Sequence, residues 1–197
     1  MMTVVRDTRQ TILGEAFDLF RKQGYAATTM GQVAEAVGIS KGNLTYHFPS
    51  KQALFEAVNA FSATFVRERL IARSFDEAPE AIAGLEDFCR RIRRWAVDPD
   101  GHFVGCIFTN VAVETQHSDV AVGQMARNTL SGFSQALGER FAAAQAAGEI
   151  RGDQDAATLS RMFFWMYEGA LTISRAMDSP IEYDAFRFTL RAWLTPA

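Results

Sequence analysis

Lys41 and Lys51 occupy an unusual position for cations, because each follows a serine that can cap a helix N-terminus, Ser40 in one case and Ser50 in the other. The helix dipole disfavours positive charge in the first turn by roughly 0.3–1 kcal/mol. A bound phosphate group would reverse that cost, since free amide groups at a helix N-terminus already bind anions. Both lysines are therefore candidate phosphate ligands; the alternative is that they simply extend into water.

The residues that follow Ser40 have the side chains needed to read DNA base edges. Asn43 can pair with an adenine edge, and Lys41 can reach guanine or phosphate. Gly42 costs about 1 kcal/mol relative to alanine inside a helix, and glycine is useful there if the backbone approaches DNA closely. In a helix-turn-helix the N-terminal residues of the second helix face the bases. The expected base-facing residues are Ser40, Lys41, Gly42, Asn43 and Thr45.

Local signals place two short helices around these residues. Thr29 and Gln32 have the spacing of a capping box at a helix start. Gly38 breaks that helix, and Ser40 caps a third helix that ends near His47. Two short helices joined by a tight glycine-containing turn, behind a longer first helix, are typical of a helix-turn-helix unit.

Residues 28–54 read TTMGQVAEAVGISKGNLTYHFPSKQAL, which closely resembles the DNA-binding domain of the TetR-type (tetracycline-repressor) transcriptional regulators. The resemblance covers residues 10–55, whereas the later helices fit the family plan only in length and number. It implies phosphate contacts for Thr29, Tyr46 and His47, and Thr45 departs from the pattern because many members have an aromatic residue there. The candidate DNA-binding residues are Thr29, Ser40, Lys41, Gly42, Asn43, Thr45, Tyr46, His47 and Lys51.

The resemblance also implies how such a protein works. It implies a homodimer that binds a palindromic operator in double-stranded DNA and acts as a repressor. A small hydrophobic or amphipathic effector would release the dimer from DNA by shifting the population of its conformations.

Apolar residues recur at helical spacing nearly everywhere and strand-like alternation is scarce, so an all-α fold is expected. The pattern predicts about nine helices, the first at residues 6–23. They divide into a helix-turn-helix DNA-binding domain at 1–50 and a larger helical effector-binding and dimerisation domain at 51–197. After a long fourth helix capped by Ser50, further helices are expected at 80–97, 106–116, 119–147, 155–177 and 182–193. The four arginines Arg90, Arg91, Arg93 and Arg94 are expected to form a solvated face.

Aromatic and polar residues are mixed in the middle helices, which is typical of an apolar cavity with a few polar groups. Ordinary core packing is the alternative for each of them. The candidate effector-binding residues are Phe61, Phe65, Trp95, Phe103, Cys106, Phe108, Asn110, Trp165, Tyr167 and Glu168, with Glu114 also considered.

The segment 159–174 is apolar nearly all round, and a helix of this kind needs partners on two sides. Together with the last helix it is expected to form the interface of a two-fold dimer, with Phe164 and Leu171 on its second apolar side. A helix buried wholly inside the monomer is the alternative.

Cys89 and Cys106 are too few for a disulfide scaffold. His102 and Cys106 lie four residues apart, but a preceding glycine favours a loop at His102, so no metal and no cofactor are expected. A buried thiol is favoured for Cys106, and a redox sensor is the alternative.

The composition is that of an ordinary globular protein, with 48% hydrophobic and 22% charged residues and a net charge of −3. Residues 1–54 hold six basic and four acidic side chains, so they are the more basic part of the chain. The start lacks a secretion signal pattern and no apolar run is long enough to span a bilayer, so a cytoplasmic protein is expected, with no membrane partner. Two other classes stay open: an enzyme that uses Cys106 or a histidine, and a helical ligand-binding protein whose helix-turn-helix is only structural.

Overall fold

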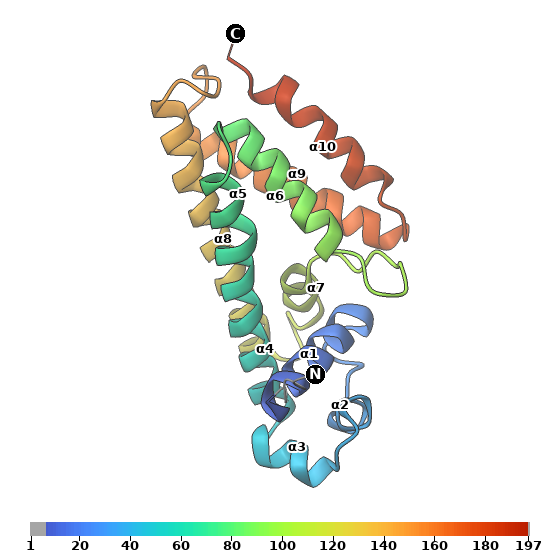
Figure 1. Ribbon diagram of the computed structural model, residues 1–197. Helices are drawn as coiled ribbons and strands as arrows, with labels where there is room; N and C mark the ends of the chain where they lie inside the picture. The colour runs from blue at the N-terminus through green and yellow to red at the C-terminus, as the bar shows by residue number, and fades with distance from the viewer. Residues whose placement is uncertain (1–6, 197) are drawn as a thin grey trace, which may run out of the picture. The chain divides into compact units, whose positions relative to one another are not determined.

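The computed structural model describes residues 7–196, and every regular element in that range is helical (Figure 1). The elements are α1 (Thr8–Gln23), α2 (Met30–Val37), α3 (Lys41–His47), α4 (Lys51–Phe65), the π-helical segment η1 (Val66–Ala72), α5 (Arg73–Asp76), α6 (Ala81–Trp95), α7 (Ile107–Glu114), α8 (Val120–Ala146), α9 (Ala156–Ala176) and α10 (Ile181–Leu194). Because α4, η1 and α5 follow one another without a break, the described residues form nine continuous helices, which confirms the expected all-α fold. Arg6, expected to begin the first helix, lies outside the described residues.

The helix ends predicted from the sequence are set by local hydrogen bonds. The Thr29 side chain accepts from the Gln32 backbone, and the Gln32 side chain accepts from the Thr29 backbone, so the expected capping box is present. Gly38 ends α2 in the left-handed conformation, with φ at +75°. Asp155 caps α9 by accepting a 2.9 Å hydrogen bond from the Thr158 backbone.

The described chain packs as two compact units. Unit 1 holds residues 7–62 and 107–127, and unit 2 holds residues 63–106 and 128–196. The predicted boundary between residues 50 and 51 stays a prediction, because these units are defined by packing alone.

Aromatic rings organise the core of unit 1. Phe20 of α1 and Phe55 of α4 are fully buried, and their ring centroids lie 5.5 Å apart in an edge-to-face contact. Tyr25, just after α1, contacts both rings. Leu44 is the buried residue of α3, so one side of α3 is packed within the protein and its other side is exposed.

Unit 2 has a larger aromatic core formed by α6, α8, α9 and α10. Phe163 of α9 contacts Phe88 of α6, Phe141 of α8 and Phe186 of α10, with ring centroids 5.6–6.4 Å apart. The helices therefore converge on one buried side of α9. No helix within residues 7–196 combines the length and the apolar character needed to cross a membrane.

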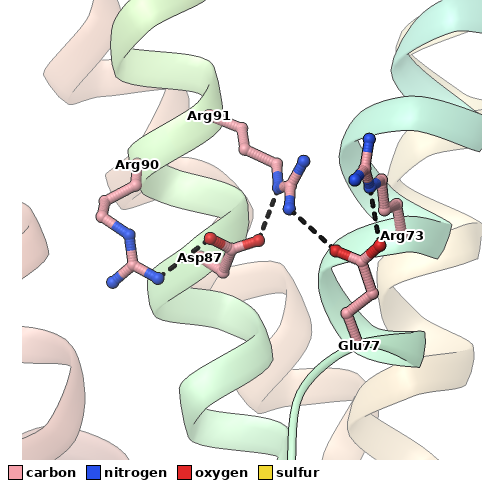
Figure 2. A network of polar contacts seen from close by, with 5 residues as sticks. All are labelled: Arg73, Glu77, Asp87, Arg90 and Arg91. Carbon is pink, nitrogen blue, oxygen red and sulfur yellow. Dashed lines mark hydrogen bonds and ion pairs between the residues drawn. The ribbon is translucent and has the colours of Figure 1, made fainter.

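The arginines of α6 form ion pairs that the sequence did not predict (Figure 2). The Asp87 carboxylate accepts from Arg90 at 2.9 Å and from Arg91, and Arg91 also reaches Glu77, which pairs with Arg73. Burial raises the pKa of Asp87, but hydrogen bonds from Arg91 and Arg90 outweigh burial and hold the pKa below its ordinary value. This network joins α5 to α6.

Arg93 is also paired, since it lies 3.5 Å from Asp184 of α10 and over the ring of Phe103. Arg94 is exposed as expected. Arg90 is exposed as well, although it pairs with Asp87 of the same helix. The expected solvated face therefore holds for Arg90 and Arg94, whereas Arg91 and Arg93 are half-buried beside the carboxylates of Glu77 and Asp184.

Candidate nucleic-acid interface

The turn between α2 and α3 is fixed by backbone hydrogen bonds. The Gly38 N–H donates to the carbonyls of Ala34 and Glu35, and the Ile39 N–H donates to Ala34 at 3.0 Å. Val33 and Ala34 are buried in α2. These contacts satisfy the last carbonyls of α2 and set the direction in which α3 begins.

The exposed side of α3 carries the residues predicted to face DNA. Of the predicted residues on this segment, His47 is half-buried and the others are exposed: Ser40, Lys41, Gly42, Asn43, Thr45 and Tyr46. Leu44, which was not in the predicted set, is buried. Tyr46 is 86% exposed, and its ring lies edge-on to that of His47. A bulky aromatic residue this exposed on a short helix is available for contact with another molecule.

Two hydroxyl groups on this segment already have partners. Ser40 Oγ accepts from the Asn43 N–H at 3.1 Å and so caps α3. Thr45 Oγ donates to the Lys41 carbonyl at 2.8 Å. The Asn43 side chain is exposed on the same helix.

Gly42 is not required by the packing of the protein itself. A Cβ placed on it would meet only Ser40 Oγ, at 3.9 Å, and its φ is not in the positive range that favours glycine. The backbone at residue 42 is therefore open to close approach from outside.

Thr29 is exposed at the start of α2, with its backbone and side chain both engaged in the capping box. It begins a helix whose first amide groups are oriented away from the helix body. The predicted phosphate contacts of Thr29, Tyr46 and His47 stay predictions.

Lys51 has partners that sequence reasoning missed. Its Nζ donates to the carbonyls of Tyr25 at 2.9 Å and Ala26 at 3.2 Å, and lies 4.3 Å from the centroid of the Tyr25 ring. The lysine therefore binds its own unit. No local pattern indicates this contact, because it joins residues 26 positions apart.

Glu114 contacts the same turn, and the sequence did not predict this contact either. Its carboxylate accepts from the backbone N–H groups of Tyr25 at 2.8 Å and Ala26 at 2.9 Å. The Tyr25 hydroxyl donates to Asp119, and burial together with the Asp119 charge raises the pKa of Tyr25 to about 12. The sequence suggested Glu114 only as a pocket residue, because nothing local connects it with a turn 88 residues earlier.

The candidate effector residues differ widely in exposure. Phe103, Cys106, Phe108 and Tyr167 are buried, and Trp95, Asn110 and Glu168 are half-buried. Phe65, Phe61 and Trp165 are 37%, 56% and 67% exposed, so Trp165 faces outward. Phe103 and Tyr167 are brought together through ring contacts with Tyr183. A cavity lined by this set stays a prediction.

Phe164 and Leu171, the two residues expected at a dimer interface, also differ in exposure. Phe164 is half-buried, and Leu171 is only 1% exposed because it shares the buried side of α9 with Phe163 and Tyr167. The Leu171 side chain therefore cannot reach a partner copy in this conformation. The exposed apolar residues of α9 are instead Trp165, Met166 and Ile173.

Both cysteines are buried. Burial raises the pKa of the Cys89 thiol to about 12, and Cys106 is 6% exposed. A redox sensor needs an exposed thiolate, so burial favours an inert thiol at each position. His102 lies in a loop, as expected, and within residues 7–196 no three His, Cys, Asp or Glu side chains form a group that could hold a metal ion.

The sequence of the chain matches two protein-family models and is similar to known regulators. The family model described as bacterial regulatory proteins of the tetR family matches residues 12–58, and a tetracyclin repressor-like C-terminal domain model matches residues 81–190. The transcriptional regulator UidR of Escherichia coli K12 is 28% identical over 194 residues, which cover 98% of this chain and 94% of UidR. The regulator RutR of the same strain is 48% identical over 50 residues, covering 25% of this chain and 24% of RutR.

Solved structures share the fold. A TetR regulatory protein from Rhodobacter sphaeroides superposes with a TM-score of 0.85 at 21% identity, over 95% of this chain and 99% of that one. Escherichia coli NemR in its reduced form superposes with a TM-score of 0.83 at 14% identity, over 97% of this chain and 100% of NemR.

Proposed function

The chain belongs to the TetR family of transcriptional regulators, and from this premise we propose that it is a repressor that binds a palindromic operator as a homodimer. A small hydrophobic or amphipathic effector releases it from DNA. It acts in the cytoplasm, where a bacterial regulator meets its DNA. The relatives compared are transcriptional regulators and not enzymes.

The observation that supports DNA binding most directly is the exposed side of α3. Lys41, Gly42, Asn43 and Thr45 lie there without covering side chains, on a helix whose first turn is capped and whose buried side is held by Leu44. Such a helix enters the major groove as a rigid element. In this arrangement Asn43 reads an adenine edge, Lys41 reaches guanine or phosphate, and Gly42 allows the backbone close to the duplex.

Phosphate contacts come from residues beside α3. Tyr46 and His47 near its end and Thr29 at the start of α2 have the hydroxyl, ring N–H and amide donors that bind phosphate oxygens. They would position α3 in the groove without selecting a sequence.

The dimer proposal is supported by apolar residues exposed on two neighbouring helices of unit 2. Trp165 and Ile173 of α9, Ile181 and Phe188 of α10, and Met177 between them are 52–81% exposed. Large exposed apolar surfaces on adjacent helices mark interaction sites. A two-fold axis through such a surface buries it on both copies, and a dimer has two α3 helices, one for each half of a palindrome.

The effector proposal rests on the aromatic interior of unit 2. Tyr167 and Phe103 place a hydroxyl group and an apolar ring in one cluster, which suits a mainly apolar molecule with a polar end. Binding would favour one of two conformations of the dimer.

The test is a gel-shift assay against the DNA upstream of the protein's own coding region, over a series of salt concentrations. A regulator binds with a steep salt dependence. Asn43→Ala should change the preference among sequences, and the exposed Arg94→Ala on α6 is the matched control that should change neither affinity nor preference. Absence of binding at the lowest salt would contradict the proposal.

Sedimentation analysis tests the dimer. Phe188→Glu should produce a monomer, whereas Val113→Glu, at a comparably exposed apolar position on α7, should leave the dimer intact. A monomeric wild-type protein at micromolar concentration would contradict the dimer.

A further inference from the structure

The turn between α1 and α2, residues 24–28, is bonded on both sides of its backbone. Glu114 of α7 accepts from the N–H groups of Tyr25 and Ala26, and Lys51 of α4 donates to the carbonyls of the same two residues. Two consecutive residues are thus held through both of their backbone groups, the N–H groups by a carboxylate and the carbonyls by an ammonium group. Charge-assisted hydrogen bonds of this kind are roughly twice as strong as neutral ones.

Further contacts hold the same turn. The Tyr25 ring packs on Phe20 and Phe55, and its hydroxyl donates to Asp119 at 3.2 Å. Thr28 is fully buried, and its hydroxyl donates to the Gly24 carbonyl at 2.7 Å. The turn is therefore a fixed element.

The place of the turn in the chain connects it with DNA reading. It ends directly before Thr29, which caps α2, and Lys51 is the first residue of α4, shortly after α3 ends at His47. The bonds from Lys51 to the turn therefore tie the start of α2 to the end of α3. They bracket the helix-turn-helix at both of its outer ends.

The Lys51 ammonium group has three N–H donors, of which two are used by the Tyr25 and Ala26 carbonyls. Its charge also lies against the Tyr25 ring. One N–H remains that Lys51 could offer a phosphate without releasing the Tyr25 or Ala26 carbonyl, so its contacts direct most of the ammonium group to the turn.

We propose that Lys51 and Glu114 are positioning residues for DNA binding, which fix the α1–α2 turn and through it the orientation of α2 and α3, and that Lys51 is not a phosphate ligand. This inference rests on the proposed DNA-binding function. The sequence predicted that Lys51 binds phosphate, and the two roles predict different measurements.

The salt dependence of DNA affinity separates the two roles. Each phosphate contact contributes about 0.9 to the slope of log affinity against log salt concentration. Lys51→Met should weaken binding by about tenfold, as expected for the loss of charge-assisted hydrogen bonds. It should do so at every salt concentration with the slope unchanged. Lys41→Met is the comparator whose loss of a DNA contact lowers the slope by about 0.9.

Glu114→Gln provides a second, independent variant. It removes a negative charge, so simple electrostatics would raise DNA affinity or leave it unchanged. A positioning role predicts weaker binding with the same slope, and a less than additive effect when combined with Lys51→Met, since both act on one turn. Affinities are measured at a temperature where circular dichroism shows every variant fully folded. If Lys51→Met does not fold, Glu114→Gln alone decides the outcome.

Three results would overturn the proposal: a slope lowered by about 0.9 in Lys51→Met, an unchanged affinity in that variant, or stronger binding by Glu114→Gln. Failure of the proposed function is a different result, since the wild-type protein itself would then not bind DNA at low salt.

Discussion

A Cβ atom placed on Gly24 would lie 2.9 Å from both carboxylate oxygens of Glu114. Residue 24 also has φ at +89°, a backbone conformation that residues other than glycine rarely adopt. The position of the Glu114 carboxylate therefore depends on glycine at residue 24, since a side chain there would occupy the same space.

Gly24→Ala should accordingly destabilise the protein by about 1–3 kcal/mol, since it adds backbone strain and displaces Glu114. Urea unfolding followed by circular dichroism measures the loss. The matched control is Gly14→Ala in α1, where a Cβ meets nothing within 4 Å and which should gain up to about 1 kcal/mol from helix propensity. Equal effects of the two substitutions would contradict this account of the turn.

Gly42→Ala should separate stability from function. The position is helical and open, so alanine should stabilise the free protein by up to about 1 kcal/mol. Affinity for DNA should fall, because the added methyl group would lie where we propose that the backbone approaches the duplex. Gel shifts and thermal unfolding on the same samples check both parts. Tighter DNA binding by the alanine variant would mean that residue 42 is not close to DNA.

Thr45 should select bases that donate a hydrogen bond. Its hydroxyl proton is given to the Lys41 carbonyl, so towards a base the oxygen can only accept. Adenine N6 and cytosine N4 offer donors in the major groove, whereas guanine offers acceptors. Selection from randomised half-sites should show adenine or cytosine at one position, and Thr45→Val should relax that preference by about fivefold, the value of one hydrogen bond. Retention of the preference in Thr45→Val would show that the hydroxyl does not read the base.

His102 and Asp178 should give the protein a pH-dependent contact. The ring Nδ1 lies 2.7 Å from the Asp178 carboxylate, and this hydrogen bond, with the charge of Asp178, raises the pKa of His102 above 6.5. The contact stabilises the folded protein fully below pH 6.5. This stabilisation is lost as the pH rises through the raised pKa of His102.

Asp178→Asn should lower the pKa of His102, although Asp98 and Asp100 still raise it. Asparagine tolerates the positive φ of residue 178, so the backbone is preserved. An NMR titration of the imidazole signals measures the change. An identical titration curve in the variant would show that the contact is absent in solution.

Much of the fold was predictable because the relevant interactions are local. Thr29 with Gln32, Ser40 with Asn43 and Asp155 with Thr158 are hydrogen bonds over three residues, so the sequence pattern contains them. The π-helical segment at Val66–Ala72 was not predicted, because the wider turns leave the apolar spacing close to that of an α-helix.

The contacts of the candidate site were less predictable. Lys51 and Glu114 meet the α1–α2 turn only after the chain has folded. The sequence favoured a phosphate for Lys51 because it begins a helix, and it favoured a pocket for Glu114 because aromatic and polar residues are mixed around it. Leu171 and Trp165 were assigned to opposite environments from those observed, because a helix that is apolar nearly all round does not indicate which side faces inward.

The short connection between α9 and α10 has a consequence for the order in which the chain folds. Only four residues separate the two helices, so closing this loop costs little entropy and their packing can form early. The bonds from Glu114 to residues 25 and 26 join positions 88 and 89 apart and require a much longer loop to close. Mutational analysis of folding rates should therefore find the helical hairpin formed in the transition state and the Glu114 contacts still absent, so that the α1–α2 turn acquires its final shape late.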